Sequence, residues 1–265
     1  MSAFQSEVIP IEAGTLAHAV RRRAAVQLVE DAITENRFEL AFQPVVSRDI
    51  RTPAFYEGLV RIRDRAGSLV PAGEFIPFIE HADVGRIIDR TVLGQGIRTL
   101  REHPHMRLSV NMSSLSIGDA DYTALLHDAL DNDPATAERL IIEITESVAM
   151  FESRRVSEFM HDIHNLGVSF AMDDFGAGYT AFRHFRDFAF DMVKVDGQFT
   201  REVNRSEDNQ VLIRALVSIA EHFGMFTVAE FVETEEEART LEKLGVQAMQ
   251  GFHFGRPAPL SELPK

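Results

Sequence analysis

The sequence predicts an α/β protein built as a modified TIM (β/α)8 barrel. Eight short apolar segments with strand character recur along the chain, and most are separated by stretches whose apolar residues have helical spacing. No linker rich in Pro, Gly or Ser, and no low-complexity tract or repeat, divides the 265 residues. This alternation favours one closed barrel over two small domains.

Composition narrows the function classes. The hydrophobic fraction of 45% is ordinary for a globular protein with a sizeable core. The net charge of −14 argues against a DNA or RNA surface built from basic patches. A phosphate-bearing ligand remains compatible if metal ions reverse the local field. Cysteine is absent, which excludes disulfides and thiolate metal sites.

Residues 1–36 are expected to form a leader and a helix ahead of a barrel domain over residues 37–265. The helical spacing runs over Leu16–Asn36 and includes the basic run Arg21–Arg23, which we interpret as a solvated helix face. The first residues lack the continuous apolar core of a signal peptide, and no stretch is long and apolar enough for a membrane span. A soluble cytoplasmic protein is the simplest interpretation.

The expected strands and helices follow in order. The strands are Leu40–Val46, Phe55–Ile62, Leu108–Met112, Leu140–Thr145, Val168–Asp173, Met192–Val195, Phe226–Ala229 and Gly251–Phe254. The main helices are Val84–Glu102, Tyr122–Leu130, Glu152–Leu166, Asp208–Phe223 and Glu235–Leu244.

One connection departs from the regular barrel pattern. Only the turn-like Ser47–Pro53 separates the first two strands, whereas a parallel crossover needs a dozen or more residues. We therefore predict that the first strand pair is antiparallel.

Polar residues at the strand ends predict a site at the barrel mouth. They are Glu57, Asn111, Glu143, Asp173–Asp174 and Glu230. Strand ends converge at one mouth of a (β/α) barrel, and oxygen ligands of this kind suit Mg²⁺ or Mn²⁺.

Strand alternation supports the same site. Ile142 and Ile144 lie on the opposite face from Glu143, and two valines lie opposite Lys194 in the same way. The apolar face suits the helix shell, which leaves the polar face for the barrel interior. Plainer alternatives exist for single residues: a helix or turn cap for Asp173–Asp174, an ion pair with Asp196 for Lys194, and a hydrogen-bonded strand end for Asn111.

Nine motifs, in order between Leu40 and Pro257, resemble the EAL family of cyclic-di-GMP phosphodiesterases. They are Phe42–Pro44, Glu57–Arg61, Phe75–Pro77, Val110–Ser113, Glu143–Glu146, Asp173–Tyr179, Lys194–Asp196, Ala229–Glu233 and Gln250–Phe254. The resemblance implies metal-dependent hydrolysis of cyclic di-GMP to linear pGpG. The alternatives are an inactive cyclic-di-GMP receptor and a signalling scaffold.

The resemblance also assigns roles at the metal site. It implies two divalent cations, Mg²⁺ or Mn²⁺. One is held by Glu57, Asn111, Glu143 and Asp173, and the second by Asp173 and Asp174, with Glu230 nearby. Lys194 would orient the attacking water, and Gln250 would lie beside it. A pair of cations neutralises phosphodiester charge and makes hydroxide available near neutral pH.

Substrate and loop contacts follow from the same resemblance. Gln43 and Glu233 would contact guanine edges, and Phe252 and Pro257 would supply apolar surface for a base, with barrel packing as the alternative for Phe252. Leu59 and Arg61 share the parity of Glu57, so Arg61 is expected to reach a phosphate oxygen. Glu146 would anchor the loop Asp174–Tyr179, which in the family leads to a dimer interface and implies a homodimer.

Two positions depart from the family pattern. The signature Glu-Ala-Leu is Glu57-Gly58-Leu59, where the missing methyl group is expected to point away from the metal. The usual glycine after Glu230 is Phe231. We expect Phe231 to affect substrate placement more than metal binding, by a clash with a neighbouring loop or by packing that shifts Glu233.

Overall fold

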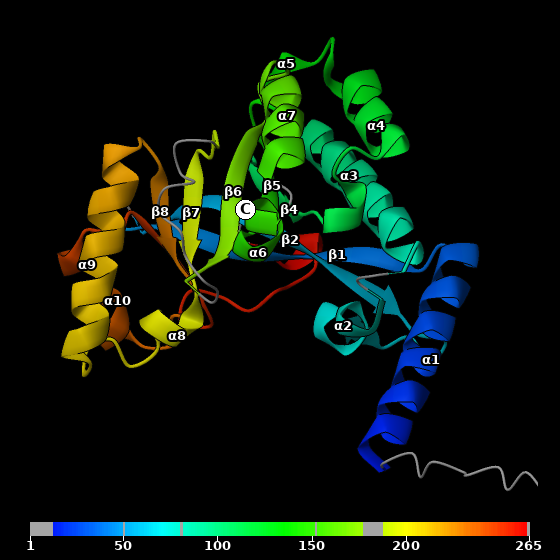
Figure 1. The fold of residues 1–265 in the computed structure, drawn as a ribbon, viewed down its shortest axis with the longest axis horizontal. Coiled ribbons are helices and arrows are strands. Elements are labelled where there is room, and N and C mark those ends of the chain that lie inside the picture. Colours follow the sequence, from blue (N-terminus) through cyan, green and yellow to red (C-terminus); the bar gives the residue numbers. More distant parts are fainter. Residues whose placement is uncertain (1–12, 50, 80–81, 152, 177–187, 264–265) are drawn as a thin grey trace, which may run out of the picture.

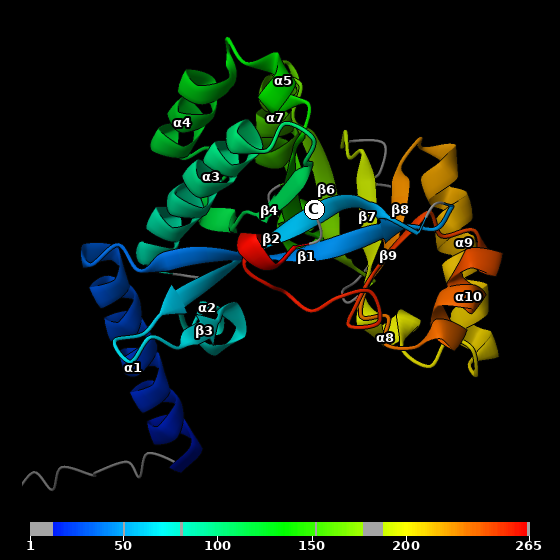
Figure 2. The ribbon, with the colours of Figure 1, turned by 180° about the vertical axis from the view of Figure 1, so that it is seen from behind.

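The protein is a closed barrel with helices on its outside, seen in a computed structural model (Figures 1 and 2). The structure describes residues 13–49, 51–79, 82–151, 153–176 and 188–263. Eight strands form the barrel wall in the order β1-β9-β8-β7-β6-β5-β4-β2, and β1 closes on β2. The short strand β3 (Leu69–Pro71) pairs with the outer end of β2.

The barrel strands agree with the predicted segments in all but one case. Their bounds are β1 (Phe38–Ser47), β2 (Pro53–Arg63), β4 (Leu108–Asn111), β5 (Leu140–Thr145), β6 (Ser169–Phe175), β7 (Met192–Val195), β8 (Phe226–Ala229) and β9 (Ala248–Gln250).

The helices over the described residues include six long ones and several single turns. They are α1 (Ala13–Thr34), α2 (Ile76–Ile79), α3 (Val84–Glu102), α4 (Ala120–Leu130), α5 (Pro134–Ala137), α6 (Glu146–Phe151), α7 (Ser153–His164), α8 (Gly197–Thr200), α9 (Glu207–His222) and α10 (Glu235–Leu244). None of the described helices is long and apolar enough to cross a membrane.

The predicted antiparallel first strand pair is confirmed. β1 and β2 run antiparallel, with Gln43 directly opposite Glu57, and β1 is also antiparallel to β9. The remaining barrel pairs are parallel. Gln43 therefore enters the barrel mouth from a strand that runs against its neighbours.

The predicted last strand is wrong. Gly251–Phe254 forms a turn, and the strand is β9, three residues earlier. A Cβ on Gly251 would lie 2.0 Å from the carbonyl oxygen of Val232, so only glycine fits there. The alternating Phe252 and Phe254 imitate a strand, but this close approach turns the chain.

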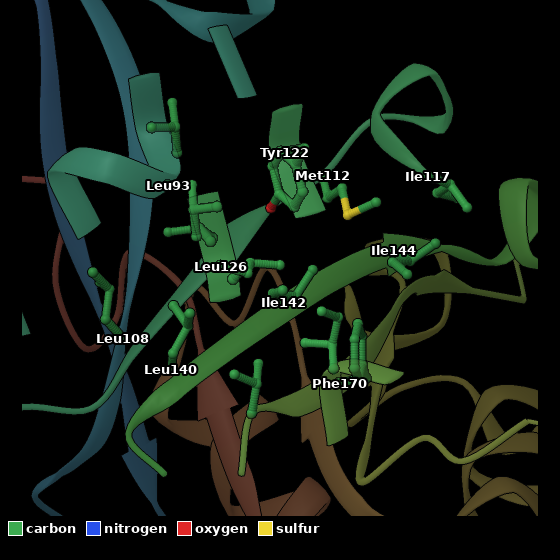
Figure 3. Close-up of a cluster of buried hydrophobic side chains, with 14 of the residues drawn as sticks. Leu93, Leu108, Met112, Ile117, Tyr122, Leu126, Leu140, Ile142, Ile144 and Phe170 are labelled. Atoms are coloured by element: carbon green, nitrogen blue, oxygen red, sulfur yellow. The ribbon is translucent and has the colours of Figure 1, made fainter. Parts of the chain in front are cut away.

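Two apolar layers hold the barrel. Outward residues of the wall, among them Leu108, Ile142 and Phe170, pack against residues of α3 and α4 such as Leu93 and Leu126 (Figure 3). A second cluster fills the barrel interior: Val45, Phe55, Ile141, Ala171, Met192, Val228 and Ala248. Each of these seven residues lies two positions from a polar residue of the same face, so the interior cluster forms the floor beneath the predicted site.

The helix α1 leads away from the barrel (Figure 1). Its later turns pack on the outer layer through Ala25, Val29 and Ala32, which are buried. Arg21–Arg23 are exposed, as expected for a solvated helix face.

Candidate active site

Lys194 lies at the centre of the barrel mouth and is fully buried. Its Nζ is 2.6 Å from Glu143 Oε2, 2.8 Å from Glu230 Oε1, 3.1 Å from Asp173 Oδ1 and 3.6 Å from Glu57 Oε2. These carboxylates come from β2, β5, β6 and the end of β8. The structure thus brings the predicted strand-end residues together, and it pairs Lys194 with them rather than with Asp196, which caps α8 through Gln198 N.

A bulge in β6 explains how two consecutive aspartates face the same mouth. The pairing of β6 with β7 shifts between Met172 and Phe175, and Asp174 has a φ of 55°. In a regular strand the two side chains would point to opposite faces. The bulge turns Asp174 back toward the site.

The cluster has a large excess of negative charge. Five carboxyl groups face one ammonium group: Glu57, Glu143, Asp173, Asp174 and Glu230 against Lys194. Burial alone would lower the pKa of Lys194, but the surrounding carboxylates raise it well above its usual value. Lys194 is therefore a fixed positive charge and not a free base.

Mutual repulsion and burial also shift the carboxyl groups. Burial, with the charges of Glu57 and Asp173, raises the pKa of Glu143 to about 8. Burial and the neighbouring Asp173 raise the pKa of Asp174 to about 6, and burial raises the pKa of Glu230 well above its usual value. Burial also opposes ionisation of Glu57, but Lys194 and hydrogen bonds from Gln250 and Asn111 outweigh it, so its pKa is lowered.

This arrangement fits divalent cations. Oxygens of Asp173, Asp174 and Glu230 lie within 4.8 Å of one another. Glu143 Oε1 is buried and has no hydrogen-bond partner, which leaves it available as a ligand. Hard oxygen donors with excess negative charge suit Mg²⁺, Mn²⁺ or Ca²⁺.

Hydrogen bonds hold the side chain of Glu57, which lies inside β2 and not at a strand end as predicted. Asn111 Nδ2 donates to Glu57 Oε1 over 2.7 Å, and Gln250 Nε2 donates to Glu57 Oε2 over 2.5 Å. Gln250 also donates to Gln43 Oε1, and Gln43 donates to the carbonyl of Gly255. Asn111 therefore has its amide oxygen left for a cation, while Gln43 and Gln250 support Glu57.

Two neighbouring cavities open over the cluster. One, of about 270 Å³, is lined by Gln43, Glu57, Leu59, Asp174, Glu230, Phe231, Glu233, Gln250, Gly251 and Phe252. The other, of about 600 Å³, lies toward α2 and α3 and shares Leu59 and Asp174 with the first. The two cavities therefore adjoin at Leu59 and Asp174, and the acidic cluster borders mainly the smaller one.

Of three predicted substrate-contact residues in the described part of the chain, Phe252 lines one of the two cavities, whereas Arg61 and Pro257 do not. Phe252 is 50% exposed at the smaller cavity, which does not agree with barrel packing. Arg61 is half-buried and donates to the carbonyl of Val60, and Pro257 is half-buried. Neither Arg61 nor Pro257 is among the described residues that line the two cavities.

Glu146 contacts the loop that it was predicted to anchor. Its Oε2 accepts a hydrogen bond from Gly176 N over 2.8 Å, and the side chain is buried. The rest of the predicted loop, residues 177–179, lies outside the described residues.

Two supporting carboxylates were missed by the sequence analysis. Asp89 on α3 accepts hydrogen bonds from Ser113 N, Ser113 Oγ and Ser116 Oγ, and so fixes the chain just after Asn111. Glu237 on α10 accepts from the backbone N–H groups of Glu202, Glu233 and Thr234. Asp89 belongs to no local sequence motif. Glu237 belongs only to the capping box that it forms with Thr234.

Replacing Glu237 by alanine is expected to lower the free energy of unfolding by about 1–3 kcal/mol, because it leaves backbone donors without their acceptor. Urea unfolding measures the change. Glu236→Ala, an exposed neighbour on the same helix, is the control and should change stability by less than about 0.5 kcal/mol. Equal effects of the two substitutions would contradict a special role for Glu237.

The comparison with known proteins decides the family. A family model described as EAL domain matches residues 26–257. The chain belongs to the EAL domain family. The EAL barrel also matches solved structures: "PaMucR Phosphodiesterase, c-di-GMP complex" has a TM-score of 0.84 at 27% identity and covers 91% of this chain and 100% of that one.

Three further similar proteins have names or titles that mention cyclic di-GMP. An EAL domain of FimX from Pseudomonas aeruginosa, bound to c-di-GMP, has a TM-score of 0.81 at 27% identity over 88% of this chain and 96% of that one. Cyclic di-GMP phosphodiesterase PdeF of Escherichia coli K12 is 27% identical over 89% of this chain. NbdA of P. aeruginosa, also named a cyclic di-GMP phosphodiesterase, is 29% identical over 92%. The chain spans 32% of the length of each of these last two.

The two departures from the EAL pattern lie in different places. A Cβ on Gly58 would lie 3.3 Å from Leu108 Cδ1 and from the carbonyl of Ser109, so it points into the barrel wall and away from the acidic cluster. Phe231 lines the smaller cavity with a φ of 55°, and its ring packs on Gly197.

Proposed function

We propose that this chain hydrolyses cyclic di-GMP to linear pGpG with two divalent cations, Mg²⁺ or Mn²⁺. The observation that carries the proposal is the buried Lys194 within a ring of carboxylates from four strands, beside a cavity with polar and aromatic walls. The names of the EAL relatives support the substrate.

The proposed metal ligands are those at the strand ends. Glu57, Asn111, Glu143 and Asp173 would hold one cation, and Asp173, Asp174 and Glu230 the other. Bound there, the cations would neutralise phosphate charge and supply a nucleophile near neutral pH. Because the pKa of Glu143 is raised to about 8, cation binding near neutral pH is expected to displace a proton from the cluster.

The chain's own residues position the reaction. A water oxygen forms a bond to phosphorus, the bond from phosphorus to the 3′ oxygen breaks, and that oxygen takes a proton to leave a 5′-phosphorylated product. Lys194, a permanent cation between Glu143 and Glu230, orients the water and stabilises charge that develops on the phosphate. Glu230 is proposed to accept the proton of the water, because it lies nearer to Lys194 Nζ, at 2.8 Å, than Glu57, the other carboxylate of this cavity that pairs with Lys194, at 3.6 Å.

The substrate contacts follow the cavity walls. Glu233 is exposed at the smaller cavity, where a carboxylate accepts hydrogen bonds from the N–H groups of a guanine edge. Gln43 lines the same cavity, and Phe252 offers it an apolar face. Arg61 interacts electrostatically with Glu57, and we propose that its guanidinium turns toward a phosphate oxygen when the substrate binds. Pro257 is proposed to support the base from the segment that follows Phe252.

Product analysis tests the proposed activity. The purified protein is incubated with cyclic di-GMP and Mn²⁺ or Mg²⁺, and nucleotides are separated by chromatography and identified by mass. We expect pGpG only with metal, and loss of product with a chelator. Bound but uncleaved nucleotide would make the chain a receptor, and no binding would leave a scaffold.

We also propose that the chain acts in the cytoplasm as a homodimer. The second part rests on the resemblance of the loop over residues 174–179 to the family's loop that leads to a dimer interface, and Glu146 holds the described start of this loop at Gly176. Light scattering after size-exclusion chromatography measures the mass, and a monomer at all concentrations would overturn the dimer.

A further inference from the structure

Phe231 presents an aromatic ring to the smaller cavity. Phe231 is 47% exposed, and Phe252, on the same cavity, is 50% exposed. A single exposed ring is unremarkable, but two on the walls of one cavity mark a surface for a ligand with apolar faces.

The chain holds Phe231 in place by an unusual backbone conformation. Its φ of 55° lies in the left-handed region, which is uncommon for a bulky residue and persists only where its surroundings enforce it. Val232, the next residue, exchanges backbone hydrogen bonds with Gln250 and His253. The turn that fixes Phe231 is therefore tied to the segment that carries Phe252.

The neighbours of the ring also hold it firmly. A Cβ on Gly197 would lie 2.6 Å from Phe231 Cδ2, so the ring occupies space that only glycine leaves free. The guanidinium carbon of Arg201 is 4.9 Å from the ring centroid, within the range of a cation–π contact. The equivalent contact at Phe252 is made by Arg256, 4.0 Å from that ring.

The polar groups beside the ring suit a nucleobase. Glu233 and Gln43 line the same cavity and offer hydrogen-bonding groups, while the two phenylalanines offer flat apolar surface. A purine has a polar edge and two apolar faces, and stacking on an aromatic side chain is its common mode of recognition.

We propose that Phe231 stacks on a purine base of the cyclic dinucleotide and adds a second aromatic contact to that of Phe252. The inference rests on the proposed function. In this proposal Phe231 increases the affinity of the site for the base and does not obstruct the substrate.

Binding of a non-hydrolysable phosphorothioate analogue of cyclic di-GMP, measured by calorimetry with Mg²⁺, tests the proposal. Phe231→Gly removes the ring and also relieves the left-handed backbone, so the variant is expected to fold. We expect its Kd to rise about 5- to 100-fold, the range for loss of one stacked base. Phe231→Tyr should bind within about threefold of the wild type, and Phe231→Leu should lie between. With cyclic di-GMP itself, the loss should appear mainly in KM.

Leu212→Ala is the matched control, since Leu212 on α9 is also 47% exposed but does not line the cavity. It should leave Kd unchanged. The stacking role would be overturned if Phe231→Gly bound the analogue as tightly as the wild type or more tightly. It would also be overturned if Phe231→Leu and Phe231→Tyr both bound with the Kd of the wild type. Failure of the wild type to bind the analogue and to cleave cyclic di-GMP would instead overturn the proposed function itself.

Discussion

Replacing Lys194 by methionine is expected to reduce turnover of cyclic di-GMP by a factor on the order of 10²–10³. The same change should lower the free energy of unfolding of the metal-free protein by about 3–5 kcal/mol, the usual range for removal of one partner from a buried ionic cluster. Lys194 is the only ammonium group within 4 Å of Glu57, Glu143, Asp173 and Glu230 among the described ion pairs, so its loss leaves their repulsion uncompensated. Steady-state kinetics and urea unfolding measure the two effects.

Divalent cations should partly restore the stability of the Lys194 variant. A cation that binds the folded protein stabilises it by mass action, and the variant has more uncompensated charge for it to neutralise. We therefore expect Mg²⁺ or Mn²⁺ to raise the melting temperature of Lys194→Met more than that of the wild type. Lys243→Met, at an exposed position of α10, is the control and should affect neither property. A stable, active Lys194→Met protein would refute the central role of this residue.

Most of the barrel strands could be predicted because they depend on local sequence patterns, namely strand alternation and turn length. The alternation of Ile142 and Ile144 with Glu143 identifies both the strand and the face that turns inward, and the short turn after β1 leaves only an antiparallel pairing. β3 has three residues and no apolar alternation, so it has no comparable signal. The last strand was misplaced because Phe252 and Phe254 alternate like strand residues, whereas the contact of Gly251 with Val232 depends on a chain segment nearly 20 residues away.

In the site, too, some features could be predicted from local sequence, and others depend on contacts between distant segments. The carboxylates other than Glu57 were identifiable because the ends of barrel strands converge whatever the details of packing, whereas Glu57 lies inside the long strand β2. The bulge that turns Asp174 into the mouth depends on its register against β7, which no alternation pattern reveals. Asp89 supports Asn111 through Ser113, 24 residues further along the chain, and only the tertiary structure shows that α3 delivers it there.

Replacing Glu230 by glutamine is expected to lower turnover by a factor of at least about 10² while the fold is retained. Glu230 Oε1 is 2.8 Å from Lys194 Nζ, and its carboxylate belongs with Asp173 and Asp174 to the one described group whose spacing suits a shared cation. The amide removes a charged ligand and a proton acceptor at once. Burial raises the pKa of Glu230 well above its usual value, and glutamine has the same size as glutamate, so we expect the amide to replace it with little loss of stability.

The Glu230 variant also separates metal binding from folding. Its melting temperature without metal should stay near that of the wild type, whereas the increase caused by Mg²⁺ or Mn²⁺ should shrink, because one ligand of the cation is weaker. Glu236→Gln, an exposed change on α10, should leave both the turnover and the metal-induced increase intact. If Glu230→Gln kept its turnover and its full response to metal, Asp173, Asp174 and Glu230 would not be a cation site, whatever the Lys194 variant showed. If it lost turnover but kept the full metal response, Glu230 would act on the water and not on the cation.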